Sequence, residues 1–154
     1  SAPVSHGKLN LFVFRGMWYN NKNGLGMDKE AALMYEGISL RVPAKESALT
    51  VVRLTTAGAA AQGCPDFETL EDFKTAVYEA CYAMTKQKVT PEELLIEYAP
   101  GEVFSVSVRG CGARRETGGR VPDQKLCYAV LTTMIPNVEI DCDSRGICCI
   151  RMHS

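Results

Sequence analysis

The stretch LEDFKTAVYEACYAMTK, residues 70–86, decides the fold class of this chain. Its apolar side chains recur three or four positions apart, which places them on one stripe of an α-helix. They are Leu70, Phe73, Val77, Ala80, Cys81 and Met84. Thr69 and Asp72 resemble a helix-capping box at the start of this stretch. We therefore expect one long amphipathic helix that packs its stripe against the rest of the chain.

Strand patterns dominate the residues before this helix. Segments 8–14, 38–42 and 48–55 are rich in apolar and β-branched residues, as is typical of β-strands. The small residues of 57–65 favour a loop that leads into the helix. The composition of residues 28–35 favours a short helix between the first two strands.

A short second helix is expected over residues 91–98. Thr90 can cap it, Pro91 suits the first helical position, and Glu93 completes a Thr-x-x-Glu box. A Pro-Gly pair directly afterwards would end it.

The last third of the chain has the patterns of an all-β segment. Residues 103–109 alternate between apolar and polar side chains, and residues 125–135 form a longer apolar run. Segments 138–142 and 147–152 are expected to pair as a hairpin, because a glycine can close the turn between them.

Strands and helices are thus segregated along the chain, which predicts an α+β fold instead of a doubly wound sheet. We expect an antiparallel sheet of about six or seven strands. It would pack on the long helix at about 70–86 and the short helix at about 91–98. A length of 154 residues suits a single domain, 1–154.

Composition narrows the class of partner. The chain is 46% hydrophobic and 23% charged, with a net charge of -1, so no global attraction to nucleic acid or anionic membranes is expected. No run reaches the roughly 20 apolar residues of a transmembrane helix. Seven irregularly spaced cysteines and no visible signal peptide predict a soluble, intracellular protein, most simply a cytoplasmic one.

A glycine- and arginine-rich loop, expected over residues 110–122, is the strongest functional signal. Glycine lets a backbone approach a ligand closely, and arginine binds phosphate or carboxylate oxygens two at a time. The candidate binding residues here are Arg109, Arg114, Arg115 and Arg120. The loop lacks a P-loop signature, and the alternative is a solvated loop whose arginines only keep the protein soluble.

Two neighbouring aromatic residues add a second candidate binding surface. Trp18 and Tyr19 follow Arg15 directly after the first expected strand. Aromatic side chains beside arginine are common in protein interfaces and on platforms that stack nucleic-acid bases. The alternative is that Trp18 covers one end of the core.

The cysteines allow two weaker hypotheses. Cys111, between glycines and arginines, is the candidate nucleophile, although both histidines lie near the chain ends. Zinc-ligand residue types gather near the C-terminus, but their spacing does not match a zinc knuckle. Those weak metal candidates are Cys142, Cys148, Cys149 and His153. We expect no cofactor.

Three functions follow from these patterns. The favoured one is a non-enzymatic interaction or assembly protein that binds a protein partner or itself through the basic loop. Its architecture resembles that of small viral matrix and assembly proteins, a likeness that implies no residue roles. The alternatives are an RNA-binding module, or another binder of anionic ligands, that uses the same arginines, and a cysteine-dependent enzyme.

Overall fold

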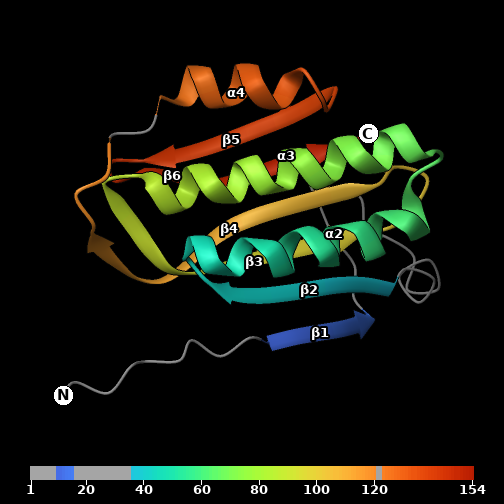
Figure 1. The fold of residues 1–154 in the computed structure, drawn as a ribbon, viewed down its shortest axis with the longest axis horizontal. Coiled ribbons are helices and arrows are strands. Elements are labelled where there is room, and N and C mark those ends of the chain that lie inside the picture. The colour runs from blue at the N-terminus through green and yellow to red at the C-terminus, as the bar shows by residue number, and fades with distance from the viewer. Residues whose placement is uncertain (1–9, 16–35, 121–122) are drawn as a thin grey trace, which may run out of the picture.

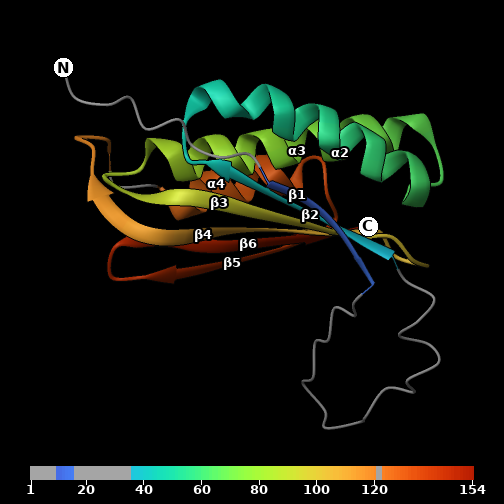
Figure 2. The same cartoon turned by 90° about the horizontal axis from the view of Figure 1, so that it is seen from below.

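The structure is a computed structural model that describes residues 10–15, 36–120 and 123–154. Within these residues the chain forms a six-stranded sheet of order β1-β2-β3-β4-β6-β5, and every pairing is antiparallel. Helices cover one face of the sheet (Figures 1 and 2). The predicted α+β class is therefore confirmed, while several of its segments are assigned differently.

The elements alternate in short groups along the chain. The strands are β1 (Asn10–Arg15), β2 (Glu36–Pro43), β3 (Val89–Ala99), β4 (Ser105–Glu116), β5 (Asn137–Asp143) and β6 (Gly146–His153). The helices are α2 (Leu49–Gly63), α3 (Phe67–Lys86) and α4 (Gln124–Thr132), and a short 3-10 turn, η1 (Glu46–Ala48), precedes α2. None of the helices in the described ranges is both long and apolar enough to cross a membrane.

The helix layer follows the order of the strands beneath it. Helix α2 contacts β2 and β3, α3 crosses the middle of the sheet, and α4 lies against β5 and α3 (Figure 1). The core fills the space between the two layers. At one point in it, the rings of Phe73 on α3 and Phe104 before β4 meet edge to face, with centroids 4.8 Å apart. Such aromatic pairs add to the stabilisation that burial itself provides.

The prediction for residues 70–86 is confirmed, and the helix extends to Phe67–Lys86. Its start differs from the expected capping box. Asp66 is the N-cap, and its carboxylate accepts a hydrogen bond of 2.7 Å from the backbone N–H of Thr69. Thr69 therefore lies inside the first turn, and its side chain is not the cap.

The predicted strand at 48–55 and the predicted loop at 57–65 are both wrong, because they form one helix, α2. Its buried residues recur at helical spacing, namely Leu49, Val52, Thr56, Ala59 and Ala60. The β-branched residues of its first half imitated a strand, and alanines carry the helix through the second half. The Thr56 hydroxyl bonds to the Val52 carbonyl at 2.7 Å and to the buried Tyr98 hydroxyl at 2.8 Å.

The expected short helix at 91–98 is strand β3. Leu94, Ile96 and Tyr98 are buried, while the residues between them are half-buried, which is a strand period of two. The Thr90 hydroxyl donates to the Gln87 carbonyl instead of capping a helix. Pairing with both β2 and β4 prevails over the local helix-start pattern.

The C-terminal third contains one confirmed hairpin and two corrections. Strands β5 and β6 pair as predicted, with Gly146 at a φ of 132° beside the turn. The expected loop at 110–122 is strand as far as Glu116, paired with β3. The expected strand at 125–135 is largely helix α4, because Asp123 caps the N–H groups of Lys125 and Leu126.

Candidate functional site

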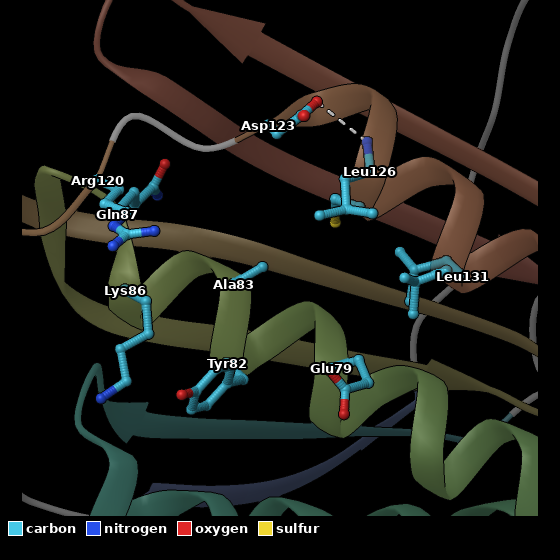
Figure 3. A pocket seen from close by; sticks show the side chains of 11 residues that line it. Glu79, Tyr82, Ala83, Lys86, Gln87, Arg120, Asp123, Leu126 and Leu131 are labelled. Atoms are coloured by element: carbon cyan, nitrogen blue, oxygen red, sulfur yellow. Dashed lines mark hydrogen bonds between the residues drawn. The ribbon is translucent and has the colours of Figure 1, made fainter.

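A pocket of about 380 Å³ lies between α3 and α4 (Figure 3). Its lining combines apolar side chains from both helices with polar groups at the end of α3 and before α4. The lining residues are Glu79, Tyr82, Ala83, Lys86, Gln87, Arg120, Asp123, Leu126, Cys127, Val130 and Leu131. A volume of this size lies within the range of small-molecule sites.

The apolar wall of the pocket is contributed mainly by α4. Leu131 is the one residue of this helix that is fully buried, whereas Leu126 is 62% exposed and Val130 is 38% exposed. Leu126 and Leu131 extend from α4 toward α3 in Figure 3. Apolar side chains that are exposed at the edge of a cavity are a common feature of ligand sites.

A hydrogen-bond network centred on Gln87 fixes the part of the pocket wall that follows α3. The buried Gln87 amide donates to the Ile147 carbonyl and accepts from the Ile147 N–H, each at 3.0 Å. Its backbone carbonyl accepts hydrogen bonds from the hydroxyls of Thr90 and Thr117. Satisfied buried networks of this kind hold their members in one geometry.

The same network places Arg120 at the pocket. The backbone N–H of Lys88 donates to the Arg120 carbonyl at 3.0 Å, and Gln87 and Arg120 form a parallel bridge. Gly119 makes this approach possible, because a Cβ at that position would collide with the Lys86 carbonyl oxygen. Arg120 is thus the predicted binding arginine that the structure brings to this pocket.

Two other charged groups of the pocket, Lys86 and Asp123, already have partners. Lys86 leaves α3 on the side away from α4, and its Nζ donates to Glu46 at 2.7 Å. That ion pair raises the pKa of Lys86. Asp123 is engaged by two backbone N–H groups at the start of α4, where the helix dipole favours a negative charge. Arg120 is therefore the group best placed to meet an acidic ligand.

The pocket has little capacity for nucleophilic catalysis. Cys127 is its thiol, and burial is the main cause of a raised pKa at this cysteine. A thiol with a raised pKa is a poor nucleophile, and no histidine stands among the lining residues. The arrangement is suited to binding.

The other predicted binding residues lie elsewhere. Arg109 is on the helix-free face of the sheet, with its guanidinium 3.8 Å from Glu97. Arg114 and Arg115 line a second pocket, where the start of β3 lies beside the end of β4. The structure thus distributes the four arginines over three places instead of one clamp. Trp18 and Tyr19 lie outside the described residues.

The candidate nucleophile Cys111 is half-buried on β4, opposite Glu93. His153 on β6 pairs with Ser105 on β4. Ser105 lies six residues before Cys111 on β4, so the distance from His153 to Cys111 is roughly 20 Å at strand spacing. A general base from His153 is therefore out of reach of Cys111 in this geometry. The other histidine, His6, falls outside the described residues.

The weak metal candidates do not converge. Cys148 donates to the Asp141 carbonyl at 3.2 Å, and Cys149 is buried beside Arg151, in a position where burial raises its pKa. Across the described part of the chain, no three histidine, cysteine or acidic residues are grouped as a metal site would require. Cys142 is exposed at the end of β5.

No protein-family model matches this chain, and no curated protein matches it significantly. Sequence reasoning missed the apolar half of the pocket, since it treated residues 125–135 as a strand. The available signal was Asp123, an N-cap residue directly before an apolar segment. As a helix, that segment presents Leu126 and Val130 on neighbouring turns of one face.

Proposed function

We propose that this protein acts by binding a small amphipathic molecule in the α3–α4 pocket. Such a ligand would have an apolar body and one acidic group. The observation that carries the proposal is the combination of exposed apolar side chains on α4 with Arg120 in the lining of the same cavity. This differs from the favoured sequence expectation, a protein that binds a protein partner or itself, and is nearer to the alternative of an anionic ligand bound by an arginine of the basic loop.

The apolar part of the ligand would occupy the space between the helices. Burying the exposed surface of Leu126 and Val130 would contribute about 25 cal/mol for each Å² removed from water. Ala83, which points from α3 toward α4 in Figure 3, adds a small apolar surface to this lining. Planar or aliphatic molecules fit this lining better than strongly hydrated ones do.

The acidic group of the ligand would meet Arg120. A guanidinium presents a planar fork of N–H donors that matches a carboxylate, sulfonate or phosphate. Asp123 is already compensated by the start of α4, so its charge opposes this contact less than that of an uncapped carboxylate would. Glu79, another lining residue on α3, would disfavour a second negative charge on the part of the ligand that lies near it.

A direct test uses anilinonaphthalene sulfonate, which has a planar apolar body and one sulfonate. We expect saturable binding to the folded protein, measured by fluorescence titration and calorimetry. Leu126→Glu should weaken this binding at least tenfold. Leu54→Glu is the matched control, because Leu54 is 69% exposed on α2 and lies outside the pocket lining.

Two outcomes would contradict the proposal. One is an absence of saturable binding, and the other is an equal loss of affinity in both glutamate variants. Because this dye also binds partly unfolded proteins, near-ultraviolet circular dichroism should show native packing throughout the titration.

Association with a protein, including a second copy of the chain, is the second candidate function. It is favoured by large apolar side chains at the surface of the helix layer outside the pocket, with Phe67 75% exposed and Leu54 69% exposed. Light scattering at several protein concentrations tests it. A mass that rises with concentration in wild type and falls in Phe67→Ser would favour this candidate over small-molecule binding.

A further inference from the structure

A second pocket, of about 420 Å³, lies where β3 and β4 continue beyond the end of β2. It shares no lining residue with the α3–α4 pocket. Its walls come from the segment after β2, the start of β3 and the end of β4. The lining residues are Pro43, Ala44, Lys45, Thr90, Pro91, Glu92, Glu93, Ala113, Arg114, Arg115 and Thr117.

Backbone hydrogen bonds and one bulge shape this cavity. The N–H of Ala44 donates to the Glu92 carbonyl at 3.0 Å, which anchors the wall after β2 to β3. On the opposite wall, the register of β3 and β4 shifts between Pro91 and Glu93, next to Gly112 at a φ of 78°. A bulge with glycine in the left-handed region re-aims the residues that follow it. Arg114 and Arg115 are those residues.

The charges that line the cavity leave a cationic excess. Lys45, Arg114 and Arg115 face two carboxylates, and one of these, Glu93, is already paired with Arg41 at 3.0 Å. Glu92 is the remaining acid. In the described residues, no ion pair within 4 Å joins it to any of the three cations.

Arg114 has a group that lacks a partner. Its Nη1 atom is buried and has no hydrogen bond. The charge of Arg114 is a minor contribution to the lowered pKa of Asp143, but that carboxylate is held by the backbone N–H of Arg145 at 2.8 Å and by the Arg145 guanidinium at 3.2 Å, and the described residues show no ion pair between it and Arg114. A partly desolvated guanidinium without a counter-charge is unfavourable, and an anion in the same cavity would relieve that cost.

We propose that this second pocket binds a small oxyanion, a phosphate or a carboxylate, with Arg114 as its principal ligand and the exposed Arg115, also in the lining, as a further source of positive charge. Lys45 contributes positive charge from the opposite wall. Arginine suits this role because its guanidinium can donate two parallel hydrogen bonds to one oxyanion. The site is independent of the ligand proposed for the α3–α4 pocket, and it gives two of the arginines singled out by the sequence a specific role.

The test is a titration with inorganic phosphate, and separately with acetate, followed by calorimetry and by the melting temperature. Chloride holds the ionic strength constant. Wild type should show saturable binding and a melting temperature that rises with the concentration of the bound anion. Arg114→Met should lose at least tenfold in affinity for that anion. Arg53→Met, which removes an exposed arginine on α2 outside this cavity, should behave like wild type.

Arg115→Met provides a second variant in case Arg114→Met does not fold. Without anion, Arg114→Met should melt no lower than wild type, because the substitution removes a group that has an unpartnered nitrogen. A preference for phosphate or for acetate would identify the oxyanion. Binding of neither anion, or an unchanged response in both variants, would overturn the site.

Discussion

Helices α3 and α4 lie next to each other on one face of the sheet, yet they contribute to the fold in opposite ways. Six side chains of α3 are buried, whereas α4 buries only Leu131. Leu126 and Tyr128 of α4 are at least half exposed. The contrast indicates that α3 holds the core together, whereas α4 leaves apolar surface exposed, which the proposed ligand would cover.

The contrast predicts its largest effect in the core. Phe73→Ala on α3 should lower the free energy of unfolding by about 3–5 kcal/mol, because it removes a fully buried ring and leaves a cavity. Leu126→Ala on α4 should cost no more than about 0.5 kcal/mol, as for other surface substitutions. Urea unfolding of the two variants measures both values.

Alanine favours helix at both positions, so the two variants differ mainly in the packing that they lose. Similar losses of stability in both would show that α4 belongs to the core as much as α3 does. The pocket between them would then be an incidental gap.

The same contrast explains what the sequence could predict. The stripe of α3 is visible without any partner, because six apolar residues repeat at helical spacing over a long segment. Helix α4 is short, and its apolar residues are nearly continuous from Leu126 to Leu131. A continuous apolar run does not distinguish a strand from a helix.

Tertiary pairing accounts for the difference at residues 91–98. Residues 91–98 carry a local helix-start pattern, but Ile96 pairs with both Leu40 and Val108, from distant parts of the chain. A local pattern cannot reveal such pairings. The sequence singled out Arg120 as a candidate binding residue but missed its apolar neighbours on α4, because the pattern of the apolar run there predicts a strand. Those neighbours can be assigned to the same pocket only once that segment is known to be a helix.

The intermediate effect concerns the cap of α4. Asp123→Ala should destabilise this helix by about 1 kcal/mol, because two N–H groups lose their acceptor. Since α4 has few buried side chains, we expect the loss to appear as local opening. Amide hydrogen exchange should accelerate in residues 124–132 and remain nearly unchanged in α3.

Asp123→Asn retains the capping oxygen and serves as the control, with exchange close to wild type. Dye affinity at the α3–α4 pocket should fall in the alanine variant, because the apolar wall is less often in place. An equal acceleration of exchange in both helices would mean that α4 does not open separately from α3.

The smallest effect concerns the cap that begins α3. The hydrogen bond from Thr69 is the main cause that lowers the pKa of Asp66. Because this pKa is lower in the folded than in the unfolded state, the stabilisation is fully present above the unfolded value and is lost as the pH falls through the folded value. The protonation of Asp66 should therefore lower the melting temperature of wild type only at acidic pH, below about 4.

Asp66→Asn isolates this contribution, since asparagine can still cap the helix but does not titrate in this range. The two proteins share every other carboxylate, including Asp143, whose pKa is also lowered, mainly by its hydrogen bond from Arg145. The difference between their melting temperatures, followed from pH 7 downward, should change only in the acidic range. A constant difference across that range would show that the Asp66 charge does not contribute to holding the first turn of α3.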